Sequence, residues 1–292
     1  MFWQTSRFRI DLSAPKVMGI VNVTPDSFSD GGQFKSTQAA LQHCEALVKA
    51  GADILDIGGE SSRPGALPLA LCVELTRVLP VLQEAVKFGV PVSIDTYKPA
   101  VMQAALDVGA DIINDIRALQ GQGVGASSDS ALQVVSQHPA CGVCIMHMHR
   151  DPQTMQTEPI QGDVIPQVLH FWERITQTLK SLNVHPNRIV LDPGIGFGKT
   201  VEQNFALLAR QQELLAAGYP LLLGWSRKSS LAIATSSSLA TIATMDVRDR
   251  LVPSVTAAIL AVQRGARIVR VHDVRETVQA LAVLRRAEHP AT

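Results

Sequence analysis

Residues 51–65 read Gly-Ala-Asp-Ile-Leu-Asp-Ile-Gly-Gly-Glu-Ser-Ser-Arg-Pro-Gly, a short apolar run followed by a polar loop. Gly51 suits the end of a helix, and residues 54–57 have the character of a short buried strand. The first half of the stretch recurs twice, in Gly109-Ala-Asp-Ile-Ile-Asn-Asp115 and Gly265-Ala-Arg-Ile-Val-Arg-Val-His-Asp273. The repeated unit is therefore a buried strand that leads into a loop of chemically useful side chains.

Apolar runs of this kind alternate along the chain with longer segments of helical periodicity. There are eight of them: Val17–Val21, Ile54–Ile57, Pro91–Ile94, Asp111–Ile113, Gly142–Met146, Arg188–Leu191, Pro220–Leu223 and Arg267–Val271. Strands without polar alternation are buried on both faces, as in a parallel sheet. Eight strand–helix repeats in roughly 250 residues are typical of an α/β fold with a single (β/α)8 TIM barrel. The alternative is a doubly wound open sheet, which normally has fewer strands.

Composition narrows the class of protein. The chain has 292 residues, 46% of them hydrophobic, so it is long enough for a large core. Its 26 basic residues balance 26 acidic ones, which gives no electrostatic case for binding nucleic acid or an anionic membrane. No apolar run approaches the roughly 20 residues that span a bilayer. No signal peptide is visible, and we expect a cytoplasmic protein with one domain over residues 1–292 and a core over about 17–286.

The four cysteines do not form a disulfide framework in a chain of this length. Cys141 and Cys144 have the spacing of a redox motif, but they lie in a predicted strand. Side chains three residues apart on a strand point to opposite faces, so we expect these two thiols not to meet.

Each predicted strand ends in polar side chains or glycines, which a TIM barrel would gather at one rim. One group suits a flat, nitrogen-rich heterocycle, because a carboxylate accepts two hydrogen bonds side by side from an amino–imino edge. This group is Asp95, Asn114, Asp192 and Lys228. A second group of hydrogen-bond donors suits a phosphate or pyrophosphate. Its members are Asn22, Arg63, Arg270 and His272. The rim thus predicts a phosphorylated heterocyclic substrate.

Each of these residues could also have a purely structural role. An isolated Asp after a strand is usually a helix cap, although eight polar strand ends in succession are hard to explain by capping. The segment Gly194–Thr200 resembles a P-loop, but that motif needs glycine at position 193, which is proline. His147 and His149 share a strand face, as in zinc hydrolases, yet the carboxylate and lysine partners of such sites are missing. We therefore expect no zinc site and regard His149 as a loop residue.

Eight motifs stand in order along the chain: Asn22-Val-Thr-Pro-Asp-Ser-Phe-Ser-Asp-Gly-Gly32, Asp56-Ile-Gly-Gly-Glu-Ser-Ser-Arg-Pro-Gly65, Ser93-Ile-Asp-Thr96, Ile113-Asn-Asp-Ile116, Met146-His-Met148, Asp192-Pro-Gly-Ile-Gly-Phe-Gly-Lys199, Ser226-Arg-Lys-Ser229 and Arg270-Val-His-Asp273. Through these motifs the chain resembles the dihydropteroate synthase family over about Val17 to Leu284. The resemblance implies a TIM barrel that joins 6-hydroxymethyl-7,8-dihydropterin pyrophosphate to p-aminobenzoate and releases pyrophosphate. These are small-molecule substrates, and the resemblance also implies a homodimer.

The resemblance also implies roles for individual residues. The heterocycle group would hold the pterin, with Met146 packing near the ring, and the donor group would hold the pyrophosphate, with Asn22 also touching Mg²⁺. The p-aminobenzoate pocket would be shaped by Ser62, Pro64, Phe197, Ser226 and Lys228. The chemistry would rest chiefly on Asp95, Arg63 and Lys228. The loops after the first two strands would close over the site.

Some residues depart from the family pattern. Ser62 stands where threonine is common, and Trp225 replaces a smaller residue, which we expect beside the p-aminobenzoate pocket. Two other functions stay open on the sequence. One is a pterin-binding methyltransferase that uses methyltetrahydrofolate, which would have no pyrophosphate for Arg63 and Arg270 to bind. The other is a paralogue that binds pterin without turnover.

Overall fold

Eight parallel strands close into a barrel within the part of the chain that the computed structural model describes, residues 1–24, 32–63, 65–123, 129–235 and 246–289. The strands are β3 (Lys16–Asn22), β4 (Ile54–Gly58), β5 (Val92–Asp95), β6 (Ile112–Asp115), β7 (Gly142–Met146), β8 (Ile189–Asp192), β9 (Leu221–Leu223) and β10 (Ala266–Val271). Each falls on one of the eight predicted runs. Because β10 pairs with β3, the sheet is closed, which confirms the TIM barrel and excludes the open sheet.

The strands separate two apolar cores. One face packs against the surrounding helices in the outer core, which includes Leu55 and Ile57 of β4. The other face fills the barrel interior in the inner core, to which β4 contributes Ile54. All five residues of β4 and all five of β7 are buried, as expected for strands covered on both sides.

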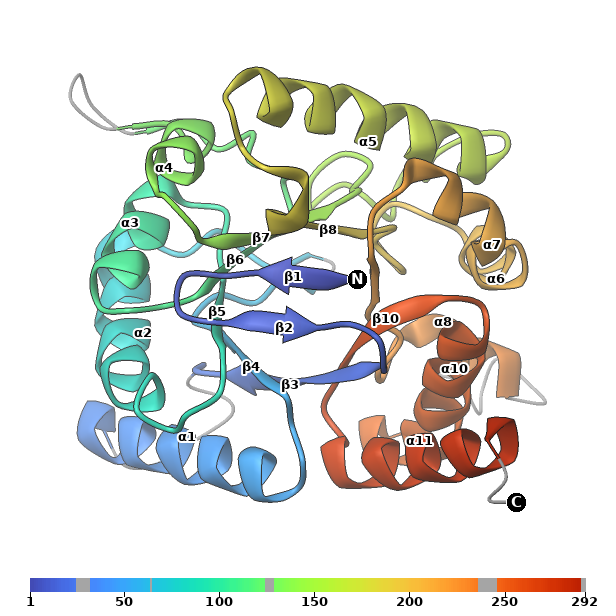
Figure 1. Ribbon diagram of the computed structural model, residues 1–292, viewed down its shortest axis with the longest axis horizontal. Helices are drawn as coiled ribbons and strands as arrows, with labels where there is room; N and C mark the ends of the chain where they lie inside the picture. Colours follow the sequence, from blue (N-terminus) through green and yellow to red (C-terminus); the bar gives the residue numbers. More distant parts are fainter. Residues whose placement is uncertain (25–31, 64, 124–128, 236–245, 290–292) are drawn as a thin grey trace.

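Helices surround the barrel in a ring (Figure 1). They are α1 (Gly32–Lys49), α2 (Leu71–Ala85), α3 (Pro99–Asp107), α4 (Ala131–Gln137), α5 (Val164–Ser181), α6 (Val201–Ala209), α7 (Gln211–Leu214), α8 (Ser229–Thr235), α10 (Leu251–Gln263) and α11 (Val274–Glu288), with short 3-10 turns η2 (Pro186–Arg188), η3 (Leu215–Ala217) and η4 (Val247–Arg250). None of the described helices is long and apolar enough to cross a membrane.

The sequence did not predict α4, α8 and α10. The first two have seven residues each, too few to show a helical period. In α10 apolar residues cover most of the circumference, so there is no contrast between faces. Of the small, polar segments 121–130 and 235–246, residues 124–128 and 236–245 lie outside the described residues.

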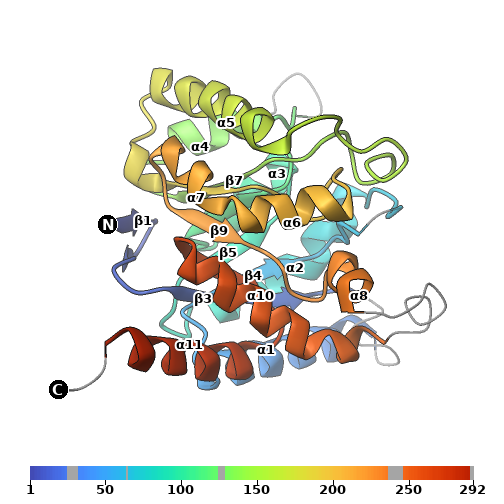
Figure 2. The ribbon, with the colours of Figure 1, turned by 90° about the vertical axis from the view of Figure 1, so that its right-hand side faces the viewer.

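An N-terminal hairpin, which the sequence did not predict, closes one end of the barrel. Its strands β1 (Phe2–Gln4) and β2 (Arg9–Asp11) pair antiparallel and lie across the barrel opening (Figure 1). Trp3 is fully buried in the inner core, and its Nε1 donates a 2.8 Å hydrogen bond to the carbonyl of Arg188. The hairpin lies at the opposite end from α8, which follows the carboxyl end of β9 (Figure 2). The sequence did not predict this hairpin because strands of three residues are too short to show an alternation of apolar and polar side chains.

The cysteines behave as expected. All four are free, Cys72 is exposed, and the other three are buried. Cys141 belongs to the outer core and Cys144 to the inner core, so their side chains lie on opposite faces of the barrel wall. The expectation that these two thiols do not meet is confirmed.

Candidate active site

The carboxyl ends of the strands bring the predicted polar residues to one level of the barrel. Parallel pairing places Gly58 between Asn22 and Asp95, and Asp95 beside Asn114. On the next strands, Met146 pairs with Asp192. This register aligns side chains that are far apart in the sequence.

A network of two carboxylates, one amide and one guanidinium forms the floor of this rim. Arg270 donates from Nε to Asp56 and from Nη2 to Asp95, each over 2.6 Å. The amide nitrogen of Asn114 donates to the same Asp56 oxygen over 3.1 Å. The other oxygen of Asp56 is buried and has no hydrogen-bond partner among the described residues. An unpaired buried acceptor is costly, so this oxygen is suited to a donor on a bound ligand.

Sequence reasoning missed Asp56. It lies inside an apolar run, yet it shares a strand face with Ile54 of the inner core, so its carboxylate points into the barrel. A polar residue on the inward face of a buried strand is the signal that could have identified it.

Arg270 was assigned from sequence to the donors for pyrophosphate. The structure pairs its guanidinium with Asp56 and Asp95, so part of its charge is already balanced by these two carboxylates. Burial raises the pKa of Asp95 to about 7, against the opposing effect of Arg270 and with further raising by Asp56 and Asp115.

Asp192 and Lys228 complete the heterocycle group. Asp192 accepts a 2.7 Å hydrogen bond from the amide of Gly194, and burial raises its pKa. Burial lowers the pKa of Lys228 to about 8, while the charge of Asp192 opposes that shift. The ammonium of Lys228 lies 4.2 Å from the ring centroid of Phe197, a cation–π contact. Met146, the predicted ring neighbour, is buried in a small cluster with Phe197.

The loop that carries Phe197 is held by a lysine that sequence reasoning did not assign. Lys199 is 2% exposed and donates to the carbonyls of His147, Gly194 and Phe197 over 3.2, 2.9 and 3.1 Å. Burial lowers its pKa to about 7. A Cβ at Gly194, whose φ is +68°, would lie 2.0 Å from the carbonyl oxygen of His147, so glycine is required there.

The remaining anion donors lie at the same rim. Asn22 is half-buried at the end of β3, and its side chain makes no hydrogen bond to another described residue. Arg63 is exposed on the loop after β4. Burial lowers the pKa of His272 to about 3, and the charges of Arg227, Arg270, Lys228 and Arg63 lower it further.

His272 is held by Ser226. The Ser226 hydroxyl oxygen accepts from the backbone amide of His272 over 3.1 Å and lies 3.0 Å from its Nδ1. If the hydroxyl donates to Nδ1, both contacts are satisfied, and a neutral imidazole then carries its proton on Nε2. His272 thereby offers one N–H donor to an anion.

The predicted p-aminobenzoate residues are only partly brought together. Phe197 and Lys228 are in contact, while Ser226 bonds to His272. Ser62 lines a cavity of about 70 Å³ that also borders Asp95. Pro64 lies outside the described residues.

The expectation for Trp225 is wrong. This side chain is 1% exposed and belongs to the outer core, where it packs against Phe205 at 5.4 Å between ring centroids. It follows β9 and points outward to the helices, so it fills space behind the rim.

A second network that the sequence did not predict fastens the loop after β4. Glu60 accepts from the amide of Leu69 over 3.1 Å and from the hydroxyl of Tyr97 over 2.8 Å, and it pairs with Lys98. Lys98 also pairs with the buried Glu74 over 2.5 Å. Since Glu60 and Leu69 join the two ends of the loop, this carboxylate fixes the base from which Ser62 and Arg63 project.

His147 and His149 follow the carboxyl end of β7. His147 is buried and meets the ring of Phe171 edge-on at 5.0 Å, and burial lowers its pKa to about 2. Among the described residues, no group of three or more His, Cys, Asp or Glu side chains is placed to hold a metal ion.

Comparison with known proteins identifies what this arrangement resembles. The sequence profile of the family described as "Pterin binding enzyme" matches residues 18–272. The dihydropteroate synthase of Neisseria meningitidis serogroup B is 46% identical over 286 residues, which cover 96% of this chain and 95% of that protein.

Two solved structures are similar over nearly the full length. Dihydropteroate synthase of Xanthomonas albilineans with 4-aminobenzoic acid is 41% identical, with a TM-score of 0.86 and coverage of 97% of this chain and 96% of that one. The enzyme of Burkholderia cenocepacia complexed with 7,8-dihydropteroate is 42% identical, with a TM-score of 0.83 and coverage of 98% and 96%.

Proposed function

The chain belongs to the dihydropteroate synthase family of pterin binding enzymes, and on that premise we propose how its own residues carry out the family's reaction. It is an enzyme of folate biosynthesis that condenses 6-hydroxymethyl-7,8-dihydropterin pyrophosphate with p-aminobenzoate and releases pyrophosphate. The observation that carries the assignment of residues is the floor network, in which Arg270 joins Asp56 to Asp95 beside Asn114.

The pterin is bound by the heterocycle group. Its amino–imino edge donates two hydrogen bonds side by side to a carboxylate, for which Asp95 and Asp192 are available at the rim. Asn114 has its amide nitrogen committed to Asp56, so its oxygen is left to accept from the ring. Met146 and Phe197 supply apolar surface from one cluster, and Lys228 donates to a ring oxygen or nitrogen.

The pyrophosphate is bound by Asn22, Arg63 and His272, with Arg270 at the junction with the pterin. Mg²⁺ is part of this proposal. The chemistry of Asn22 fits it, because a hard cation takes amide oxygen together with water and substrate phosphates, and the Asn22 side chain bonds to no other described residue. Bound there, Mg²⁺ would neutralise charge on the pyrophosphate.

In the reaction, the C–O bond between the pterin methylene and pyrophosphate breaks, and the electron pair leaves with pyrophosphate. Arg63 and the Nε2–H of His272 stabilise that negative charge. The electron-rich pterin carries the positive charge, next to the carboxylate of Asp95. The arylamine nitrogen then forms the new C–N bond and loses a proton to solvent. No protein nucleophile is required.

The arylamine enters beside the pterin, where Phe197 and Lys228 are in contact. Ser62 reaches the pocket on the loop after β4, and Ser226 reaches it from the loop after β9; Pro64, which the family resemblance assigns to the pocket, lies outside the described residues. Closure of the loop after β4 would exclude water from the cationic intermediate, while residues 25–31 of the first loop lie outside the described residues. Glu60 holds the base of the second loop through the amide of Leu69.

We also propose a homodimer in the cytoplasm. Val252 on α10 and Val283 on α11 are 72% and 70% exposed, and these apolar side chains on neighbouring helices are suited to an interface between two copies. Sedimentation velocity should give a dimer in dilute solution, and a charged substitution at Val252 should shift it to monomer.

Pyrophosphate release tests the function. The chain should release pyrophosphate from dihydropterin pyrophosphate and Mg²⁺ only when p-aminobenzoate is present, and Arg63→Ala should reduce that release by about 100-fold, as for loss of one donor to a developing anion. Arg9→Ala on β2, at the other end of the barrel, is the matched control and should retain activity. If pterin binds but the amine causes no release, the chain is a non-catalytic binder.

A further inference from the structure

Arg227 has a backbone conformation that is rare for its residue type. It lies in the turn between Ser226 and Lys228, where the amide of Lys228 donates to the carbonyl of Trp225 over 3.2 Å. Its φ is +60°, in the left-handed region. The third residue of such a turn is usually glycine, because a Cβ makes this conformation unfavourable. A strained residue between two proposed site residues calls for an explanation.

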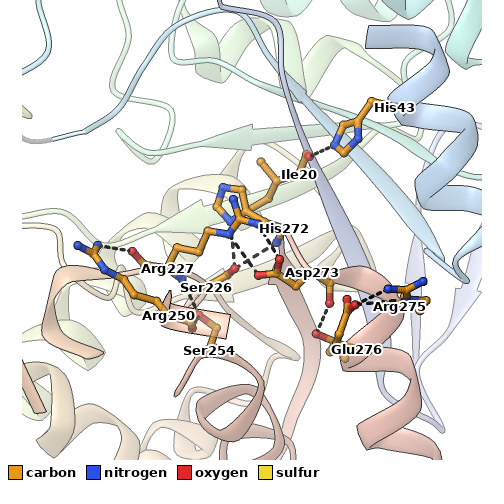
Figure 3. A network of polar contacts seen from close by, with 11 residues as sticks. Ile20, His43, Ser226, Arg227, Arg250, Ser254, His272, Asp273, Arg275 and Glu276 are labelled. Atoms are coloured by element: carbon orange, nitrogen blue, oxygen red, sulfur yellow. Dashed lines mark hydrogen bonds and ion pairs between the residues drawn. The ribbon is translucent and has the colours of Figure 1, made fainter. Parts of the chain in front are cut away.

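Residues at the start of α10 form hydrogen bonds with the backbone N–H and the backbone carbonyl of Arg227 (Figure 3). Its N–H donates to the hydroxyl oxygen of Ser254 over 2.9 Å, and its carbonyl accepts from Nη1 of Arg250 over 3.0 Å. Ser254 is 3% exposed and itself donates to the carbonyl of Arg250 over 2.5 Å. The strained backbone is therefore fixed on each side by a neighbouring element.

The side chain of Arg227 reaches the loop after β10. It donates to Asp273 from Nη2 over 2.6 Å and from Nε over 3.2 Å, a two-point ion pair (Figure 3). Asp273 directly follows His272, and Ser226 directly precedes Arg227. The two loops are thus joined at consecutive residues, Ser226 to His272 and Arg227 to Asp273. Glycine would fit the turn better, but it would leave only the first connection.

We propose that Arg227 is a positioning residue of the reaction, which sets the loop carrying Lys228 against the loop carrying His272 through its ion pair with Asp273. This inference rests on the proposed roles of Lys228 and His272. Lys228 acts on the pterin and arylamine, and His272 acts on the departing pyrophosphate, so their separation must match the bond that breaks between those groups. A planar, two-point contact fixes that separation more firmly than a single hydrogen bond.

The test compares kcat and KM for both substrates in wild type, Arg227→Gly, Arg227→Lys, Asp273→Asn and the double variant Arg227→Gly/Asp273→Asn. Arg227→Gly keeps the turn and removes the ion pair with Asp273. Because small misplacements of catalytic groups are costly, we expect kcat to fall by about 10- to 100-fold, with KM changing much less. Arg227→Lys should recover part of the loss, and the double variant should fall no further than either single one.

The control is Arg210→Met, which removes an arginine that pairs with Asp163 and Glu213 on the outer surface. It should leave kcat unchanged. Thermal unfolding is measured for every variant to show that it folds. If Arg227→Gly does not fold, the test compares kcat of Asp273→Asn with kcat of Arg210→Met.

Wild-type kcat in the folded Arg227→Gly and Asp273→Asn variants would overturn the positioning role and leave the proposed function standing. Failure of wild type itself to release pyrophosphate would instead refute the proposed function.

Discussion

Arg270 donates a 2.6 Å hydrogen bond to Asp56, a fully buried carboxylate 214 residues earlier in the chain. The pair joins β4, the second barrel strand along the chain, to β10, the last one, at the floor of the site. It also leaves one oxygen of Asp56 without a partner among the described residues. The predictions below start from this floor.

Removing the charge of Asp56 should destabilise the fold. In Asp56→Asn, Arg270 loses one of its two carboxylates in a buried setting, and we expect the free energy of unfolding to fall by about 2–3 kcal/mol, the worth of a hydrogen bond to a charged group. Urea unfolding measures it. Glu84→Gln is the control, because Glu84 pairs with Lys87 over the same 2.6 Å but at the surface, and it should cost at most about 1 kcal/mol. Equal losses would contradict the prediction.

Turnover should depend on the ionisation of Asp95. Burial raises its pKa to about 7, so the carboxylate is present above that pH and is progressively protonated below it. A protonated carboxyl cannot accept two hydrogen bonds from the pterin edge. We therefore expect kcat/KM for dihydropterin pyrophosphate to rise as pH increases from 6 to 8. The same pH profile is measured for Asp95→Asn, to distinguish titration of Asp95 from titration of the substrate phosphates. A pH dependence that persists in the variant belongs to the substrate phosphates.

Pyrophosphate binding should be accompanied by proton uptake at His272. Burial and the surrounding cations lower its pKa to about 3, so the imidazole is neutral at pH 7. A bound polyanion reverses the local charge and raises that pKa. Titration calorimetry in two buffers of different ionisation enthalpy gives the number of protons taken up. His272→Gln should take up fewer protons than wild type, and an unchanged number would refute the assignment.

The N-terminal hairpin should stabilise the barrel without acting on catalysis. Trp3 is fully buried at the end opposite the site, and Trp3→Ala should reduce the free energy of unfolding by about 3–5 kcal/mol. Trp3→Phe keeps most of the packing and loses the hydrogen bond to Arg188, so about 1 kcal/mol is expected. Measured at a temperature where each variant is folded, kcat/KM should equal that of wild type; a large fall would show that the hairpin influences the site.

Thiol reactivity should follow burial. Cys72 is exposed, whereas Cys44, Cys141 and Cys144 are buried, and burial raises the pKa of Cys44 to about 12. A thiol reagent at pH 8 should modify one cysteine per chain quickly and the other three only on unfolding. Cys72→Ser should abolish the fast phase, and a remaining fast phase would contradict the burial.

Much of the fold was predictable because burial leaves a periodic record in the sequence. The eight apolar runs fell on the eight strands, and the polar residues that follow them met at one rim. Elements that are short or apolar on all sides, such as β1, β2, α8 and α10, left no such record. They were found only in the structure.

The candidate site also has a part that the sequence predicted and a part that only the structure revealed. The sequence by itself determined which residues reach the rim, since the end of each strand fixes the position of a backbone; Asp95, Asn114 and Asp192 are examples. Only the tertiary structure decided the partners of the long side chains. Arg270 turns to Asp56 and Asp95, Arg227 crosses to Asp273, and Trp225 points away from the rim to Phe205. A side chain with several rotatable bonds is directed by charges and cavities supplied by distant segments, and a local pattern does not record them.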